Sequence, residues 1–146
     1  MSVLSQSTIA DVISLSGIGI HTGKRVNMRI LPSFPNSGIS FKRIDLKQNN
    51  IVIPNFENVS DATLCTTVTN HYGVKVSTIE HLMAAFLGLG IDNAIVEVDS
   101  QEVPILDGSA KDFVDLLKKT GLKTSDVPIK IIKSLSSIPL IELLKI

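Results

Sequence analysis

The chain has 146 residues, the size of one compact domain with a single hydrophobic core. It carries 14 Lys and Arg and 14 Asp and Glu, so its formal charge is zero and no basic field is available to attract nucleic acid or an anionic membrane. Hydrophobic residues make up 44% and charged residues 19%, which excludes an intrinsically disordered chain. A single cysteine, Cys65, excludes an internal disulfide and any four-thiolate zinc site, and favours a reducing compartment.

Two features bear on the compartment. Residues 1–15 have neither the basic region nor the continuous apolar run of a secretory signal. The most apolar window, residues 82–91, is half of the roughly 20 residues needed to cross a bilayer. We therefore expect a soluble, cytoplasmic protein with no transmembrane segment and no nucleic-acid partner.

The first predicted elements along the chain are strands. Residues 25–30 alternate polar and apolar side chains with period two, which is typical of a half-buried strand. A turn follows over residues 32–38, and the alternation resumes at residues 39–42. This pattern predicts a hairpin.

Further strand signals follow. Residues 51–53 end at Pro54, which suits an edge strand or a loop because proline cannot donate to a sheet ladder. Residues 64–69 are rich in β-branched side chains and predict a strand. Residues 70–73 then predict a tight turn.

A first helix is predicted from Ser77. Residues 77–80 have the S-x-x-E form of a capping box, and the apolar residues after them fall on one helical stripe. Glycines at 88 and 90 are expected to end the helix.

A buried strand over residues 91–98 is predicted next. A second helix follows, capped by Ser109 with Asp112 and ending at Gly121.

The order of elements is a run of strands, then helix, strand and helix. This order predicts an α+β fold with two helices packed on one face of a mainly antiparallel sheet. We assign residues 1–122 to this domain. Residues 123–127 resemble a linker in composition, and residues 128–146 form a short apolar tail too small for a second domain.

His81 is the one histidine of three with a carboxylate beside it in a predicted helix. Zinc hydrolases use about three protein ligands and a carboxylate that takes a proton from the bound water, and His81 and Glu80 could supply one of each. The segment matches neither H-E-x-x-H nor H-x-x-E-H. From the residues alone, plainer interpretations are favoured: Glu80 bonds back to the Ser77 amide, and His81 is a boundary residue.

Residues 17–24 are rich in glycine but fit neither common phosphate-loop spacing, so a turn between strands is predicted. Cys65 lies in an apolar segment and is by default a small buried hydrophobe. The residue patterns alone leave the function open.

Five segments in their order along the chain carry a resemblance, and they cover residues 16–24, 64–66, 76–85, 88–93 and 102–109. Together they closely resemble the N-terminal half of the UDP-3-O-acyl-N-acetylglucosamine deacetylase family, the zinc amidases of lipid A synthesis in Gram-negative bacteria. The match covers about residues 8–122.

The resemblance implies two similar α+β domains whose helical layers face each other, of which this chain is the first. It implies that His81 ligates Zn²⁺ and that Glu80 is the general base. The family's other ligands, in an H-x-x-x-D pattern, come from the second domain, and this sequence contains no such pattern. The residues matched to the substrate pocket are Thr63, Leu64, Cys65 and, with a substrate or structural role, His21.

The implied reaction is hydrolysis of the acetamide of UDP-3-O-acyl-N-acetylglucosamine, with zinc lowering the pKa of its bound water. Because the second domain is missing, we expect a truncated chain that is inactive alone. The alternative is a binding or assembly module, either half of a split enzyme that docks on a separately encoded second domain or a noncatalytic remnant. This alternative predicts an exposed apolar face on the helical layer.

Overall fold

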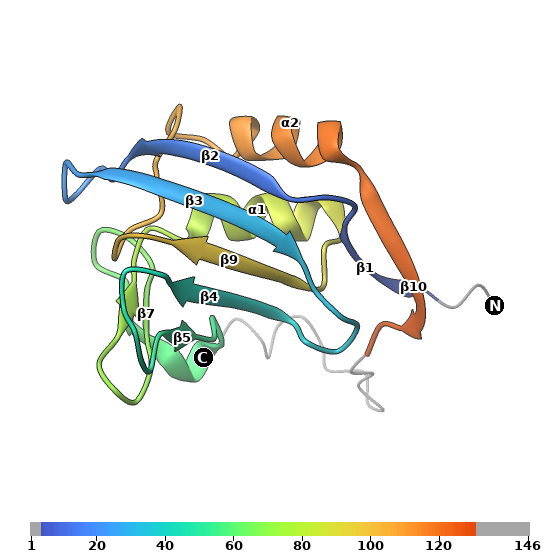
Figure 1. The fold of residues 1–146 in the computed structure, drawn as a ribbon, viewed down its shortest axis with the longest axis horizontal. Coiled ribbons are helices and arrows are strands. Elements are labelled where there is room, and N and C mark those ends of the chain that lie inside the picture. The colour runs from blue at the N-terminus through green and yellow to red at the C-terminus, as the bar shows by residue number, and fades with distance from the viewer. Residues whose placement is uncertain (1–3, 131–146) are drawn as a thin grey trace, which may run out of the picture.

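The computed structural model describes residues 4–130, whose arrangement is drawn in Figure 1. A central five-stranded sheet has the order β2-β3-β9-β4-β5. Its strands are β2 (Ile13–Ile18), β3 (Arg25–Pro32), β4 (Ile39–Arg43), β5 (Ile51–Val52) and β9 (Ala94–Val98). A second sheet pairs β1 (Ser5–Ile9) with β10 (Leu122–Pro128), and a third contains β6 (Val59–Asp61), β7 (Thr67–Thr69) and β8 (Lys75–Val76). The helices are α1 (Glu80–Leu89), α2 (Lys111–Thr120) and a 3-10 turn at Phe56–Asn58.

The hydrophobic core lies between the central sheet and the two α-helices, which stand behind the sheet and at its upper edge in Figure 1. β3 buries every second residue, with Met28 and Ile30 each 1% exposed. Phe86 of α1 and Phe113 of α2 belong to the same buried cluster. One sheet face covered by helices, with mostly antiparallel strands, confirms the predicted α+β class.

The predicted hairpin between residues 25–30 and 39–42 is wrong, although both segments are strands. β9 lies between them, antiparallel to β3 and parallel to β4. The inward residues of β9 are fully buried, and a strand of this kind gains most from a central place with partners on both sides. Local alternation cannot reveal a partner strand that comes much later in the chain.

The other strand predictions hold in part. β5 is the edge strand of the central sheet, as Pro54 indicated. Of the predicted strand at residues 64–69, only Thr67–Thr69 pairs with neighbours, and residues 64–66 form a loop. The predicted turn at residues 70–73 is confirmed, because the Gly73 amide donates to the Asn70 carbonyl at 2.9 Å.

The ribbon of β1 and β10 was not predicted from the sequence. Residues 123–127, whose composition resembled a linker, lie within β10 and pair with β1. Asp92 ties this ribbon to the central sheet by accepting a hydrogen bond from the Ser7 amide at 2.7 Å. The tail from residue 131 onward lies outside the described residues.

Each helix ends at a glycine that the sequence analysis expected to end it. Gly90 follows α1 in the left-handed region with φ of 69°, and Gly121 follows α2. At the start of α2, the Ser109 hydroxyl accepts a hydrogen bond from the Lys111 amide at 3.0 Å, while Ala110 occupies the N-cap. Over residues 4–130, neither helix combines the length and apolar character that crossing a bilayer requires.

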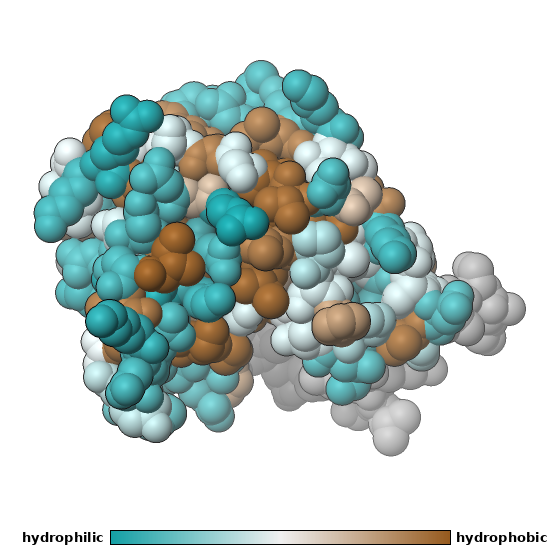
Figure 2. All heavy atoms as spheres, in the orientation of Figure 1, coloured by the Kyte–Doolittle hydropathy of each residue, from teal (hydrophilic) through white to brown (hydrophobic). Residues whose placement is uncertain are grey.

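The sheet face turned away from the helices is largely polar. Figure 2 views the molecule from this side and shows hydrophilic side chains around a smaller apolar area. Glu97 of β9 forms ion pairs there with Arg29 at 3.3 Å and Lys42 at 3.1 Å. The basic partners are 51% and 41% exposed, so solvent weakens both pairs, although Glu97 itself is 12% exposed. Glu97 makes none of the hydrogen bonds of the candidate site, which suits it as a control position.

Candidate functional site

A pocket of about 490 Å³ lies where the turn after β2, the three-stranded sheet and the paired segments of Ser77 and Glu102 come together, at the left end of Figure 1. The residues predicted to contact substrate, which are His21, Thr63, Leu64 and Cys65, all line it. A larger hollow of about 600 Å³ lies beside β1 and β10, and none of these four residues lines it. The smaller pocket is therefore the candidate site. Glu80 and His81 are not among its lining residues, and Glu80 is connected to it through a hydrogen bond to the loop of Thr66.

Glu80 is the first residue of α1, and its carboxylate bonds to the loop that follows β6. Oε2 accepts a hydrogen bond from the amide of Thr66, with 2.9 Å between the nitrogen and the oxygen. Thr66 lies between two pocket residues, Cys65 and Thr67. A carboxylate in the first turn is also stabilised by the helix dipole.

The predicted capping box is wrong. The N-cap of α1 is Ile79, which has no side-chain capping bond. Ser77 is part of a bridge to Glu102, and the Ser77 amide donates to the Gln101 carbonyl at 2.8 Å. Because Ser77 is held in this extended pairing, the helix begins three residues later and the Glu80 carboxylate is left to bond Thr66.

His81 follows Glu80 on α1 and is half-buried. Successive helical residues point about 100° apart, so Glu80 and His81 face different parts of the site. Within residues 4–130, no group of three His, Cys, Asp or Glu side chains could hold a metal ion. An imidazole nitrogen is a donor that zinc accepts, so His81 could supply one ligand, but the described residues do not by themselves make a complete zinc site.

Glu102 is a pocket residue that the sequence analysis did not single out. It is 1% exposed, and its carboxylate accepts hydrogen bonds from the amides of His21 and Thr22, each at 2.9 Å. The hydroxyl of Thr78 donates to the same carboxylate at 3.0 Å. This buried carboxylate accepts from three donors on two distant segments and so connects those segments. Only the three-dimensional contacts reveal this role.

The ionisation of Glu102 follows from these contacts. Burial opposes the charged form, but the hydrogen bonds from His21, Thr22 and Thr78 outweigh it and hold the pKa of Glu102 below its ordinary value. The carboxylate is therefore charged at neutral pH. This fixed negative charge lies at the wall of the pocket.

The loop that carries Thr63, Leu64 and Cys65 is shaped by its own hydrogen bonds. The Thr63 amide donates to Asp61 at 2.9 Å, and this bond lowers the pKa of Asp61. Cys65 is half-buried and lies 3.7 Å from the Thr67 hydroxyl, measured from its sulfur. Leu64 is 81% exposed.

Several large apolar side chains of α1, β2 and the turn after β2 are exposed. Leu87 of α1 is 85% exposed, Ile18 is 50% exposed and Ile20 is 58% exposed. An exposed apolar helical face was the expectation for a chain that binds a second module.

Comparisons with known proteins show the family to which the sequence is similar. The chain matches the family model described as UDP-3-O-acyl N-acetylglycosamine deacetylase over residues 6–142. It is 46% identical over 131 residues to the UDP-3-O-acyl-N-acetylglucosamine deacetylase of Pseudoalteromonas atlantica, and 44% identical to those of Methylococcus capsulatus and Shewanella baltica. Each of these matches covers 90% of this chain and 43% of the relative, so the chain spans less than half the length of those proteins.

Proposed function

Because the chain belongs to the UDP-3-O-acyl N-acetylglycosamine deacetylase family, we propose that it provides one half of a zinc-dependent active site that hydrolyses the acetamide of UDP-3-O-acyl-N-acetylglucosamine. The observation that carries the proposal is the Glu80 carboxylate, held through one oxygen by the amide of Thr66, which lies between the pocket residues Cys65 and Thr67, and followed by His81. The proposal includes a place in lipid A synthesis in the cytoplasm of Gram-negative bacteria.

Glu80 is the general base. The Thr66 amide fixes Oε2, and within residues 4–130 Oε1 makes no hydrogen bond, so Oε1 is the oxygen that accepts a proton from the attacking water. The water oxygen bonds to the acetyl carbon, the C–N bond breaks, and the proton goes to the amine nitrogen. The products are acetate and a free amine.

His81 is one ligand of the metal. A bound zinc ion would polarise the acetyl carbonyl and lower the pKa of the water beside it. The imidazole of His81 is half-buried on α1, next in sequence to the base. The remaining ligands must come from polypeptide beyond the described residues, because those residues contain no group of three donors.

The pocket residues orient the substrate. His21 and the loop of Thr63, Leu64 and Cys65 lie around one cavity, whose walls also include Lys75. Lys75 and His21 can donate to polar groups of a nucleotide sugar, the carboxylates of Asp61 and Glu102 in the same wall can accept from its hydroxyl groups, and the exposed Leu64 offers an apolar contact.

A binding or assembly role is the second candidate function. It is favoured by the exposure of three large apolar side chains, Leu87 of α1, Ile18 of β2 and Ile20 in the turn after β2. In this role the chain docks on a separate second domain or is a noncatalytic remnant.

The experiment is to mix the purified chain with a polypeptide carrying the remaining portion of a relative, and to measure zinc content and deacetylation. We expect both to appear only in the mixture, and we expect His81→Ala to lose zinc. Turnover by the chain alone would contradict the half-site proposal, and failure to recover zinc or turnover in the mixture would favour the remnant.

A further inference from the structure

We propose that Glu102 is a positioning residue that fixes both the turn carrying His21 and the backbone of Thr78, and through Thr78 the place of Glu80. This inference rests on the proposed function for its catalytic meaning, but its structural part stands on contacts within residues 4–130. The inference concerns how the pocket residues and Glu80 are kept in fixed positions relative to each other.

The carboxylate of Glu102 joins two segments that are far apart in sequence. Oε1 accepts from the His21 amide and from the Thr78 hydroxyl, and Oε2 accepts from the Thr22 amide. A charged acceptor with several donors forms stronger hydrogen bonds than a neutral one. Glu102 therefore holds the turn after β2 directly against the segment that leads into α1.

Thr78 shows why this contact matters to the helix. It is 2% exposed and has φ of 59°, in the left-handed region that β-branched residues rarely adopt. Such a conformation persists only where its surroundings hold it. The bond from its hydroxyl to Glu102 supplies that restraint, together with the Ser77 bridge on its N-terminal side.

The backbone conformation of Thr78 determines the position of Glu80. Only Ile79 separates the two residues, and the Ile79 amide donates to the Thr66 carbonyl at 3.5 Å. Glu80 then bonds the Thr66 amide. If Thr78 leaves the left-handed region, both contacts to Thr66 are lost together.

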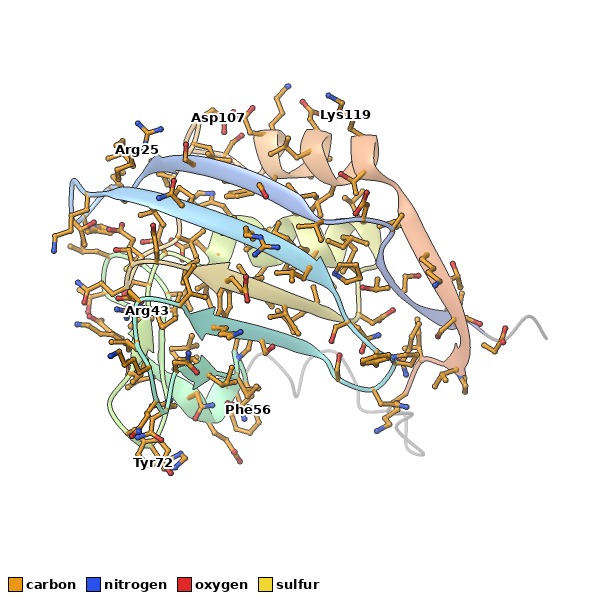
Figure 3. The ribbon with its side chains drawn as sticks, viewed as in Figure 1. Arg25, Arg43, Phe56, Tyr72, Asp107 and Lys119 are labelled. Carbon is orange, nitrogen blue, oxygen red and sulfur yellow. The ribbon has the colours of Figure 1, made fainter. Side chains whose placement is uncertain are left out.

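The turn after β2 packs closely against the segment that contains Glu102. A Cβ at Gly19 would collide with the Glu102 carboxylate and lie 2.6 Å from the Thr22 hydroxyl. A Cβ at Gly17 would lie 2.8 Å from the side chain of Pro104. In Figure 3, the labelled Arg25 and Asp107 lie at the end of the molecule where this turn meets the segment after Glu102.

The test is hydrogen exchange of backbone amides, measured by NMR on the whole chain. Thr78→Val keeps the branched shape but removes the hydroxyl, whereas Thr78→Ser keeps the hydroxyl and serves as the conservative rescue. We expect Thr78→Val to lower protection of the Thr66 amide by about tenfold or more while central β3 amides keep theirs. We expect Thr78→Ser to restore it.

Glu102→Gln is the second variant, and Glu97→Gln on the outer sheet face is its matched control. Glu102→Gln should lower protection of the His21 and Thr22 amides as well as Thr66, and Glu97→Gln should change none of them. Unchanged Thr66 protection in Thr78→Val would overturn the proposal, even if Glu102→Gln fails to fold. An equal loss of protection in β3 would also overturn it, because the effect would then be global.

The catalytic consequence is measured separately in the reconstituted mixture. Thr78→Val should lower kcat more than it raises KM, and Thr78→Ser should return kcat toward the unsubstituted value. If the mixture has no activity at all, the proposed function fails while the exchange result still decides the positioning role. A Thr78→Val protein with lost Thr66 protection but full kcat would overturn the catalytic part of this inference.

Discussion

The Glu80 carboxylate and the Thr66 amide form a hydrogen bond of 2.9 Å that joins the first residue of α1 to the loop lining the pocket. The two residues are 14 positions apart, so this bond is tertiary and not a helix cap. It restrains one oxygen of the carboxylate and leaves the other without a hydrogen bond among the described residues. The bond therefore holds the carboxylate in position relative to the loop of Leu64 and Cys65, which line the pocket.

Glu80→Gln separates the two roles of this side chain. The amide oxygen of glutamine still accepts from Thr66, so we expect the fold and the zinc content of the reconstituted mixture to be retained. The loss of the basic oxygen should lower turnover by about 10²- to 10⁴-fold. Deacetylation assays with Glu97→Gln as control measure this, and near-normal turnover in Glu80→Gln would leave Glu80 with a structural role alone.

The local patterns of the sequence were sufficient for the fold class and for the ends of both helices. Alternation located β3 and β4, and Gly90 and Gly121 marked the helix ends. The order of strands was not predictable in the same way, because β9 enters between β3 and β4 through long-range pairing.

The residues of the site divide in the same way, into those that the sequence predicted and those that only long-range contacts reveal. The S-x-x-E pattern at residues 77–80 was consistent with a capping box, but the bridge between Ser77 and Glu102 competes with it and prevails. The resemblance to the family named four pocket residues and the Glu80-His81 pair. Glu102 had no local signal, because its role comes from donors on two other segments.

Gly19 and Gly88 form a matched pair for testing the close packing at Glu102. A methyl group at Gly19 would collide with the Glu102 carboxylate, which its three hydrogen bonds keep from moving aside, so we expect Gly19→Ala to destabilise the chain by about 1–3 kcal/mol. Gly88 is in α1 with open space around it, so Gly88→Ala should be neutral or stabilise by up to about 1 kcal/mol. Denaturant unfolding of both variants measures the difference, and equal stabilities would contradict the packing at Gly19.

Leu87 tests the docking of a second module on α1. The side chain is 85% exposed, so Leu87→Asp should change the free energy of unfolding by no more than about 0.5 kcal/mol. A charge placed in an apolar interface should nevertheless weaken association with the complementary polypeptide. Titration calorimetry compares the affinities, with Val12→Asp as an exposed control in the connection between β1 and β2. Unchanged binding by Leu87→Asp would remove α1 from the interface.

The Glu102 carboxylate predicts how stability depends on pH. Its folded pKa is below the ordinary glutamate value, because hydrogen bonds from His21, Thr22 and Thr78 outweigh the opposing effect of burial. The stabilisation is therefore fully present above the unfolded pKa of about 4.3 and is lost as the pH falls through the lower folded value. Glu102→Gln cannot titrate, so the difference in unfolding free energy between it and the unsubstituted chain should be largest near pH 7 and shrink under acid. Thr78→Val keeps the acid but removes one donor, which should move the loss of stability to higher pH. Urea unfolding across this pH range measures both effects, and parallel pH profiles for the unsubstituted chain and Glu102→Gln would show that the carboxylate is not held in its charged form.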